Sequence, residues 1–318
     1  MSYRSLACAV ALAVAPALHA QNFPNKPVRL IVPFAPGGST DIMGRILGQK
    51  LTEMWGQQVV VDNRSGGGTI IGTEMAVKSP ADGYTLLLAN IALALNPGLQ
   101  PKLPFDPVKD LAPISLLANQ ATALAATSTL PASNVKELIA HAKTRPDGLS
   151  FGSSSTGSVG HIAGEMFRSA TGTKMVHVPY KGGGPAAVDV IAGQIPVAFI
   201  SLPTVMTHYK AGKLKVLAVT DGKRSGAAPD VPTIGETIPG FAVNNWIGML
   251  APAALPKPLV QRVHGDLGKV LRMTDVKEKL SGQGFDILAS SPEEFGATIR
   301  GDIAKYTKVI KAAGIKEN

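Results

Sequence analysis

Cysteine is nearly absent from this chain of 318 residues, in which Cys8 is the one cysteine. Cys8 lies in an N-terminal stretch that we expect to be removed, so disulfides, thiolate metal sites and cysteine nucleophiles are excluded from the remainder. Aromatic residues are also few, at 5% of the chain, which leaves little surface for stacking the bases of a single-stranded nucleic acid. We therefore expect no nucleic-acid partner.

Patterns that bind metals and cofactors are missing too. The 6 histidines are isolated and lack ligand spacing, which predicts no metal site. Residues 66–72 depart from the dinucleotide-binding pattern because Ile71 occupies the place of its third glycine. The chain also contains no Walker A lysine after the glycine loop at residues 152–157 and no G-x-S-x-G elbow. We expect no cofactor.

Positive charge is in excess but is not concentrated. The net charge is +9, yet no window approaches the run of about five or six like charges that marks a nucleic-acid-binding tail. A diffuse positive charge steers small anions toward a protein. An ordinary basic surface would account for the charge equally well.

The N-terminus has the pattern of a secretory signal. Arg4 provides a positive charge, residues 6–18 are apolar, and the small residue Ala20 follows them. We expect cleavage after Ala20. The apolar run is shorter than the roughly 18 to 20 residues that a membrane anchor needs, and an exported chain without disulfides is typical of the Gram-negative periplasm. The predicted location is the periplasm.

Strand and helix patterns alternate along the first part of the chain. Residues 28–32, 59–61 and 84–88 are β-rich, and they are separated by segments with apolar residues at helical spacing, at about 43–55 and 70–78. Such alternation predicts parallel βαβ units in an α/β fold. After a proline-rich stretch at residues 96–113, a strand-like run at 114–126 opens a second series.

The two series predict two similar α/β lobes with a cleft between them. Helices expected near residues 258–273, 275–281 and 292–313 would return to the first lobe. The predicted division is a signal peptide at 1–20, the first part of lobe one at 21–120, lobe two at 121–222, and the return connection with the rest of lobe one at 223–318.

Four glycine- and serine-rich loops each lie between a predicted strand end and a helix start, at residues 34–41, 64–69, 153–158 and 180–184. A helix N-terminus presents free N–H groups and partial positive charge to an anion. Loops at the carboxyl ends of strands line the ligand crevice of α/β proteins. Tight strand-to-helix turns need glycine in any case, but four such loops in two lobes favour a cleft that binds an anion.

A hydrolase is the main alternative from another class. Ser154 or Ser155 with His161 could form a nucleophile–base pair. No acid that would orient the histidine can be identified, and His161 also fits a polar residue in the first turn of its helix.

Six motifs are spread along the chain. They are PFAPGGSTD at 33–41, DNR at 62–64, ADGYTL at 81–86, GSVGHIAGE at 157–165, VPYKGG at 178–183 and LAVT at 217–220. Together they resemble the motifs of the Bug-type extracytoplasmic solute receptors of tripartite tricarboxylate transporters. The resemblance covers essentially the whole mature chain.

The resemblance implies a two-lobe periplasmic binding protein of the Venus-flytrap, type II-like class that closes on a small carboxylate and performs no chemistry. Backbone groups and ordered waters from the two loops at 34–41 and 153–157 would hold the ligand. It also implies separate membrane transporter subunits as partners, and we expect a monomer. The alternatives left open are a secreted serine hydrolase and a periplasmic ligand sensor for a signalling partner.

The ligand-binding residues that follow from the loops and the resemblance come from both lobes. They are Phe34, Ala35, Pro36, Gly37, Gly38, Ser39, Asp41, Asn63, Asn90, Ser153, Ser154, Ser155, Thr156, Gly157, His161, Tyr180, Lys181 and Ile200.

Ile200 marks a departure from the family. Such receptors commonly show a Val-Asp-x-x-Phe-Asp pattern here, whereas this chain has IPVAFI at residues 195–200. Without an acid at this place, a ligand ammonium would lose solvation and gain no partner. We therefore expect Ile200 to disfavour amino acids, unless its side chain points into the core of lobe two.

Overall fold

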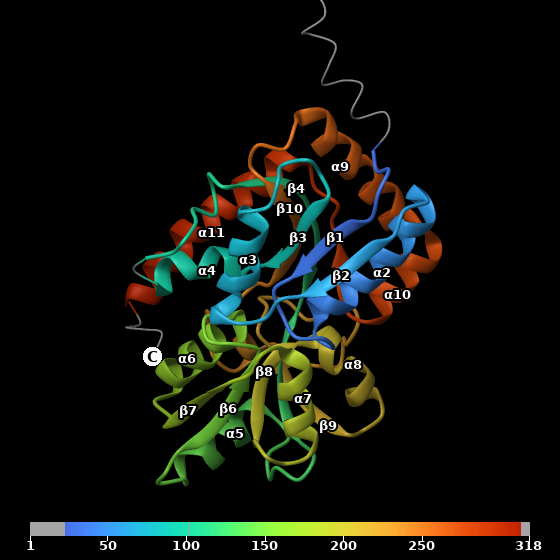
Figure 1. Cartoon of the computed structure of the whole chain (residues 1–318). Helices are drawn as coiled ribbons and strands as arrows, with labels where there is room; N and C mark the ends of the chain where they lie inside the picture. Colours follow the sequence, from blue (N-terminus) through green and yellow to red (C-terminus); the bar gives the residue numbers. More distant parts are fainter. Residues whose placement is uncertain (1–22, 101, 313–318) are drawn as a thin grey trace, which may run out of the picture.

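Two separate β-sheets organise the chain, one above the other in Figure 1. The structure is a computed structural model and describes residues 23–100 and 102–312. The expected signal peptide lies outside these residues. Within them, no helix has the length and apolar character that crossing a bilayer requires.

The sheet of lobe one has six strands in the order β11-β4-β10-β3-β1-β2. Strand β1 pairs in parallel with β2 and β3, as the βαβ pattern predicts, while β10 and β11 add antiparallel pairs. The strands are β1 (Val28–Val32), β2 (Val59–Asn63), β3 (Thr85–Asn90), β4 (Leu111–Gln120), β10 (Trp246–Pro252) and β11 (Phe285–Ile287).

The sheet of lobe two has five strands in the order β7-β6-β8-β5-β9. Strand β6 pairs in parallel with β7 and β8, and β5 runs antiparallel to β8 and β9. The strands are β5 (Thr122–Thr127), β6 (Leu149–Ser153), β7 (Met175–Pro179), β8 (Val197–Ser201) and β9 (Leu214–Val219).

The strand-like run expected at residues 114–126 contains parts of two strands. Ala121 separates β4 from β5, and these two strands belong to different sheets. The chain therefore crosses between the lobes within one apolar run. Both halves of the run are largely buried, so the run is apolar on either side of Ala121.

Helices cover both sheets. Around lobe one lie α2 (Ser39–Trp55), α3 (Ile70–Val77), α4 (Ala92–Leu99), α9 (Lys257–Arg272), α10 (Thr274–Gly282) and α11 (Pro292–Ala312). Around lobe two lie α5 (Val135–Lys143), α6 (Val159–Thr171), α7 (Gly183–Ile191) and α8 (Leu202–Lys210). The sequence patterns had not indicated α4 or α8.

The two crossings between the lobes lie side by side. The backbone N–H of Thr220 donates to the carbonyl of Thr122 at 2.8 Å, and the N–H of Val243 donates to the carbonyl of Thr220 at 2.9 Å. The N–H of Gln120 donates to the carbonyl of Asn245 at 2.9 Å. These bonds tie the connections into one ribbon, which is the hinge between the lobes.

Helix α6 approaches the lobe-two sheet so closely that two of its positions admit no side chain. A Cβ on Gly160 would clash with the carbonyl oxygen of Phe199, and one on Gly164 would clash with the Phe151 ring. Close contact brings the N-terminus of α6 to the carboxyl end of β6, where the serine loop begins.

We expect Gly160→Ala to destabilise the protein by about 1–3 kcal/mol, because the added methyl overpacks a helix–sheet contact. Gly265→Ala in α9 is the matched control, since no atom lies within 4 Å of its added Cβ. That control should be neutral or stabilising by up to about 1 kcal/mol through helix propensity. Urea unfolding of both variants measures the difference, and equal stabilities would contradict the packing argument.

Candidate functional site

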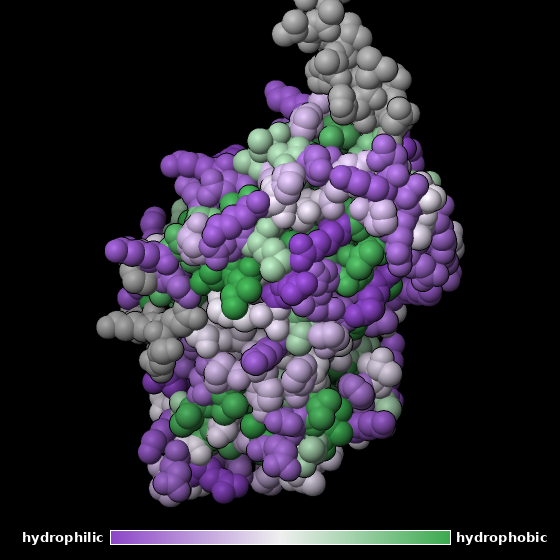
Figure 2. Space-filling model, in the orientation of Figure 1, coloured by the Kyte–Doolittle hydropathy of each residue, from purple (hydrophilic) through white to green (hydrophobic). Residues whose placement is uncertain are grey.

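A cavity of about 280 Å³ lies between the lobes. Phe34 and the glycine loop at residues 65–69 line it from lobe one, and residues 154–156 and 179–181 line it from lobe two. Figure 2 shows weakly polar residues along the band where the lobes meet, with apolar residues in separate patches. We call this space the outer cavity.

A second, much smaller space of about 10 Å³ adjoins it, since Phe34 and Ser154 line both. We call it the niche. It is about the size that one water molecule or one ligand oxygen needs. Its other lining residues are Gly38, Ser39, Thr40, Asn90, Gly183, Ser201 and Thr204.

The loops of the two lobes touch directly beside the niche. The backbone N–H of Ala35 donates to the carbonyl of Lys181 at 2.8 Å. A Cβ on Gly184 would lie 2.9 Å from the Pro36 carbonyl oxygen, and one on Gly182 would lie 3.1 Å from the Ala35 Cβ. Glycine at these positions therefore allows the two backbones to approach each other. The sequence had suggested a different role for such glycines, which was to let an anion approach the backbone.

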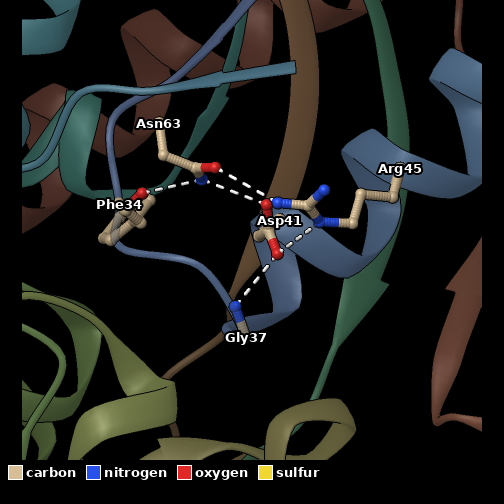
Figure 3. Close-up of polar contacts among 5 residues, drawn as sticks. All are labelled: Phe34, Gly37, Asp41, Arg45 and Asn63. Atoms are coloured by element: carbon tan, nitrogen blue, oxygen red, sulfur yellow. Dashed lines mark hydrogen bonds and ion pairs between the residues drawn. The ribbon is translucent and has the colours of Figure 1, made fainter.

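Asp41 and Asn63 hold the lobe-one loop in shape (Figure 3). The Asp41 carboxylate accepts hydrogen bonds from the Gly37 N–H at 2.9 Å, from Asn63 Nδ2 at 3.0 Å and from Arg45 Nε at 2.9 Å. Asn63 Nδ2 also donates to the Phe34 carbonyl at 2.9 Å. Neither side chain lines the outer cavity or the niche, so each supports the loop from behind.

His161 supports the lobe-two loop in the same way. It is 5% exposed, its Nδ1 accepts the Gly157 N–H at 3.2 Å, and its ring stacks on that of His177 with centroids 3.9 Å apart. The sequence did not indicate His177 because it lies 16 positions further along the chain, in β7. The stacked pair lies beneath the loop and outside both cavity linings.

The histidine nearest a serine cannot act as its base. Ser153 Oγ donates to the Ser155 carbonyl at 2.9 Å and lies 2.7 Å from His177 Nε2. Because a hydroxyl carries one proton, His177 Nε2 is the donor in that contact. The suggested pairing of Ser154 or Ser155 with His161 is not formed among the described residues: Ser155 Oγ has no hydrogen-bond partner, and His161 Nδ1 accepts from the Gly157 N–H instead.

Burial keeps both rings neutral. Desolvation lowers the pKa of His177 to about 3, with the neighbouring His161 contributing. Desolvation also lowers the pKa of His161, against the opposing charge of Glu165.

Tyr180 and Lys181 lie on the wall of the outer cavity. Tyr180 Oη donates to Asp189 Oδ2 at 2.6 Å, and burial together with this carboxylate raises its pKa to about 12. Lys181 is the one charged side chain among the described residues that line the outer cavity. The wall thus offers a cation and no carboxylate.

The remaining predicted residues divide between the linings and the core. Ser154, Ser155 and Thr156 line the outer cavity, while Ser39 and Asn90 line the niche. Ile200 is 1% exposed and packs among the apolar residues beneath α7 and α8. It lines neither space, so its expected contact with a ligand is corrected: the alternation of side chains along β8 points it into the core.

Sequence reasoning missed Thr69, Asn96, Ser201 and Thr204. Thr69 lines the outer cavity, and Ser201 and Thr204 line the niche. Asn96 and Thr204 belong to the two helices that the patterns had not indicated. A search for hydroxyl residues at the end of each strand or just after it would have found Ser201 and Thr204.

Comparisons with known proteins agree with this geometry. A model of the tripartite tricarboxylate transporter family receptor matches residues 43–315. Protein BugT of Bordetella pertussis is 34% identical over 306 residues, covering 95% of this chain and 94% of BugT.

Two solved structures from Rhodopseudomonas palustris are similar along the whole fold. Rpa4515 with adipate is 33% identical with a TM-score of 0.88, covering 92% of this chain and 98% of the other. MatC with bound malate is 26% identical with a TM-score of 0.86, covering 91% of this chain and 100% of MatC.

The two lobes, the hinge and the lined cleft define a two-lobe periplasmic binding protein, and the solved structures share this fold. Within that class, the chain belongs to the family of tripartite tricarboxylate transporter receptors. These receptors are periplasmic and bind solutes, and the chain is not an enzyme. The hydrolase alternative is therefore wrong.

We expect the neutral histidine pair to make the protein less stable as the pH decreases. An unfolded histidine binds a proton below about pH 6.5, whereas folded His177 resists protonation down to about pH 3. The stabilising contribution is thus complete above pH 6.5 and is lost as pH falls toward 3. Between pH 7 and 5, His177→Gln should reduce the loss in unfolding free energy by about 1–2 kcal/mol.

His208→Gln, in the last turn of α8, is the control and should keep the pH dependence of the unmodified protein. Denaturant unfolding at several pH values gives all three curves. A His177→Gln curve parallel to that of the unmodified protein would rule out the neutral pair.

Proposed function

We propose that this chain captures a small organic carboxylate between its lobes and delivers it to a membrane transporter built from separate polypeptides. Residues 21–120 and 223–318 would form lobe one, and residues 121–222 would form lobe two. The proposal includes export to the periplasm with cleavage after Ala20.

The buried hydroxyl of Thr204 carries this proposal. Thr204 is 8% exposed, and its Oγ1 has no hydrogen-bond partner among the described residues. It lines the niche and lies about 3.3 Å from where a Cβ on Gly183 would be. A buried hydroxyl without a partner is costly, and one oxygen in the niche would remove that cost.

The surroundings of the niche favour a negatively charged oxygen. Ser39 is the first residue of α2 and Gly183 is the first residue of α7, so the positive ends of two helices meet there. No aspartate or glutamate is among the described residues that line it. Asp41, in the first turn of α2, binds the loop and Arg45 instead.

The outer cavity suits the rest of a small acid. Its volume of about 280 Å³ is near the lower limit of typical ligand sites, and Lys181 adds a positive charge at the wall. Adipate and malate are the molecules bound in the two similar structures, which supports a carboxylate here.

We expect malate, adipate or a related acid to raise the melting temperature, because binding the folded state alone adds about 2.7 kcal/mol at 100 times Kd. Thr204→Val keeps the shape but removes the hydroxyl, so it should weaken carboxylate binding about tenfold or more. The unliganded variant should be at least as stable as the unmodified protein, since Val leaves no unpaired hydroxyl. Thr204→Ser, which keeps the hydroxyl, is the matched control.

Calorimetry and thermal melts measure these effects. The proposal fails if a broad panel of organic acids leaves the melting temperature unmoved while sugars or cations raise it. Delivery is tested separately: cells lacking this chain should lose uptake of the acid and regain it on expression of the chain, whereas a sensor would change gene expression without changing uptake.

We also expect succinate to bind more tightly than aspartate. The described lining of both spaces holds Lys181 and no acidic side chain, so the ammonium of aspartate would be desolvated beside a cation with no partner. Isothermal calorimetry with the two acids at the same pH compares them directly. Tighter binding of aspartate would contradict this account of the lining.

A further inference from the structure

Asn96 links α4 to the glycine loop that lines the outer cavity. It is 2% exposed, and its Nδ2 donates to the Gly68 carbonyl at 3.1 Å and to Thr69 Oγ1 at 3.3 Å. Gly68 and Thr69 both line the outer cavity, but Asn96 does not. Asn96 therefore bonds residues of the cavity wall without lining the cavity itself.

The loop that Asn96 holds has an unusual backbone. Four consecutive residues have positive φ: Gly66 at 132°, Gly67 at 53°, Gly68 at 60° and Thr69 at 84°. Glycine adopts such values freely, but for a β-branched residue a positive φ is a true outlier. Strained residues of this kind persist where their surroundings hold them, and the Asn96 amide bonds both Thr69 and its neighbour.

Helix α4 gives Asn96 a fixed support. Gly98 packs against α11 so closely that an added Cβ would lie 2.9 Å from Ile310 Cδ1 and 3.1 Å from Thr307 Cα. Figure 1 shows α4 beside α11 on the flank of lobe one. The long C-terminal helix thus fixes the position from which Asn96 reaches the loop.

The other side of Asn96 faces lobe two. A Cβ on Gly157 would lie 3.2 Å from Asn96 Oδ1 and 3.0 Å from Leu99 Cδ1. Gly157 ends the serine loop of lobe two and has φ +75°. One side chain therefore bonds the lobe-one wall of the cavity and lies beside Gly157 of the lobe-two loop.

We propose that Asn96 is a positioning residue for the binding site, holding the loop at residues 65–69 in its strained, cavity-lining form and fixing where the lobe-two loop meets it at Gly157. This inference rests on the proposed function for its binding test, but its structural part can be measured without a ligand. Asn96 acts through the loop and does not touch the ligand.

Asn96→Leu is the main test, because leucine has a similar shape and removes both hydrogen bonds. We expect binding of malate or adipate to weaken about tenfold, and hydrogen exchange of the amides at residues 66–71 to become at least tenfold faster without ligand. Ser115→Ala is the matched control: it removes another buried hydrogen bond of lobe one, to the Ser290 carbonyl at 2.8 Å, far from the loop. It should leave affinity and loop exchange unchanged.

A double-mutant cycle separates positioning from general stability. Thr69→Gly removes the backbone strain, so adding Asn96→Leu to that variant should change affinity less than threefold. Should Asn96→Leu not fold, Thr69→Val removes the Oγ1 acceptor alone and is judged by the same two measurements.

Unchanged affinity and unchanged loop exchange in Asn96→Leu would overturn the inference. So would an equal loss of affinity in Ser115→Ala, or the same loss from Asn96→Leu with and without Thr69→Gly. If the unmodified protein binds neither acid, the proposed function fails on its own, and loop exchange still decides the role of Asn96.

Discussion

The closed cleft depends on backbone meeting backbone across the two lobes. The bond from the Ala35 N–H to the Lys181 carbonyl, at 2.8 Å, joins loops that follow strands in different sheets. Added Cβ atoms at Gly182 and Gly184 would crowd Ala35, Pro36 and Gly37, so the lobe-two side of this contact needs glycine. The same contact brings the N-termini of α2 and α7 to the niche, so closure and anion attraction arise from one arrangement.

The glycine- and serine-rich loops do not fix their own conformation, and buried polar side chains behind them fix it instead. Asp41 bonds the first loop, His161 bonds the serine loop, and Asn96 bonds the glycine loop. Each accepts from or donates to backbone groups, which leaves the opposite side of the loop free to face a ligand. This division explains why the strongest polar networks of the site lie just outside the two cavities.

Charge in the site follows the same logic. Carboxylates near the cleft have local partners: Asp41 forms an ion pair with Arg45, and Asp189 accepts a hydrogen bond from the Tyr180 hydroxyl. The buried histidine pair stays neutral because desolvation lowers the pKa of both rings. What remains exposed to the cavities is the partial positive charge of helix ends and the Lys181 ammonium, a field that favours anions.

The sequence by itself determined the α/β alternation, the bounds of β1, the end of α2 at Trp55, and the serine and glycine loops, because local periodicity and turn residues specify them. Only the tertiary structure decided which residues of those loops face the cleft. It placed Ile200 in the core, Asp41 behind its loop and Thr204 in the niche. The stacking of His161 on His177 was likewise invisible, because contacts between elements far apart in the sequence depend on how the chain folds in three dimensions.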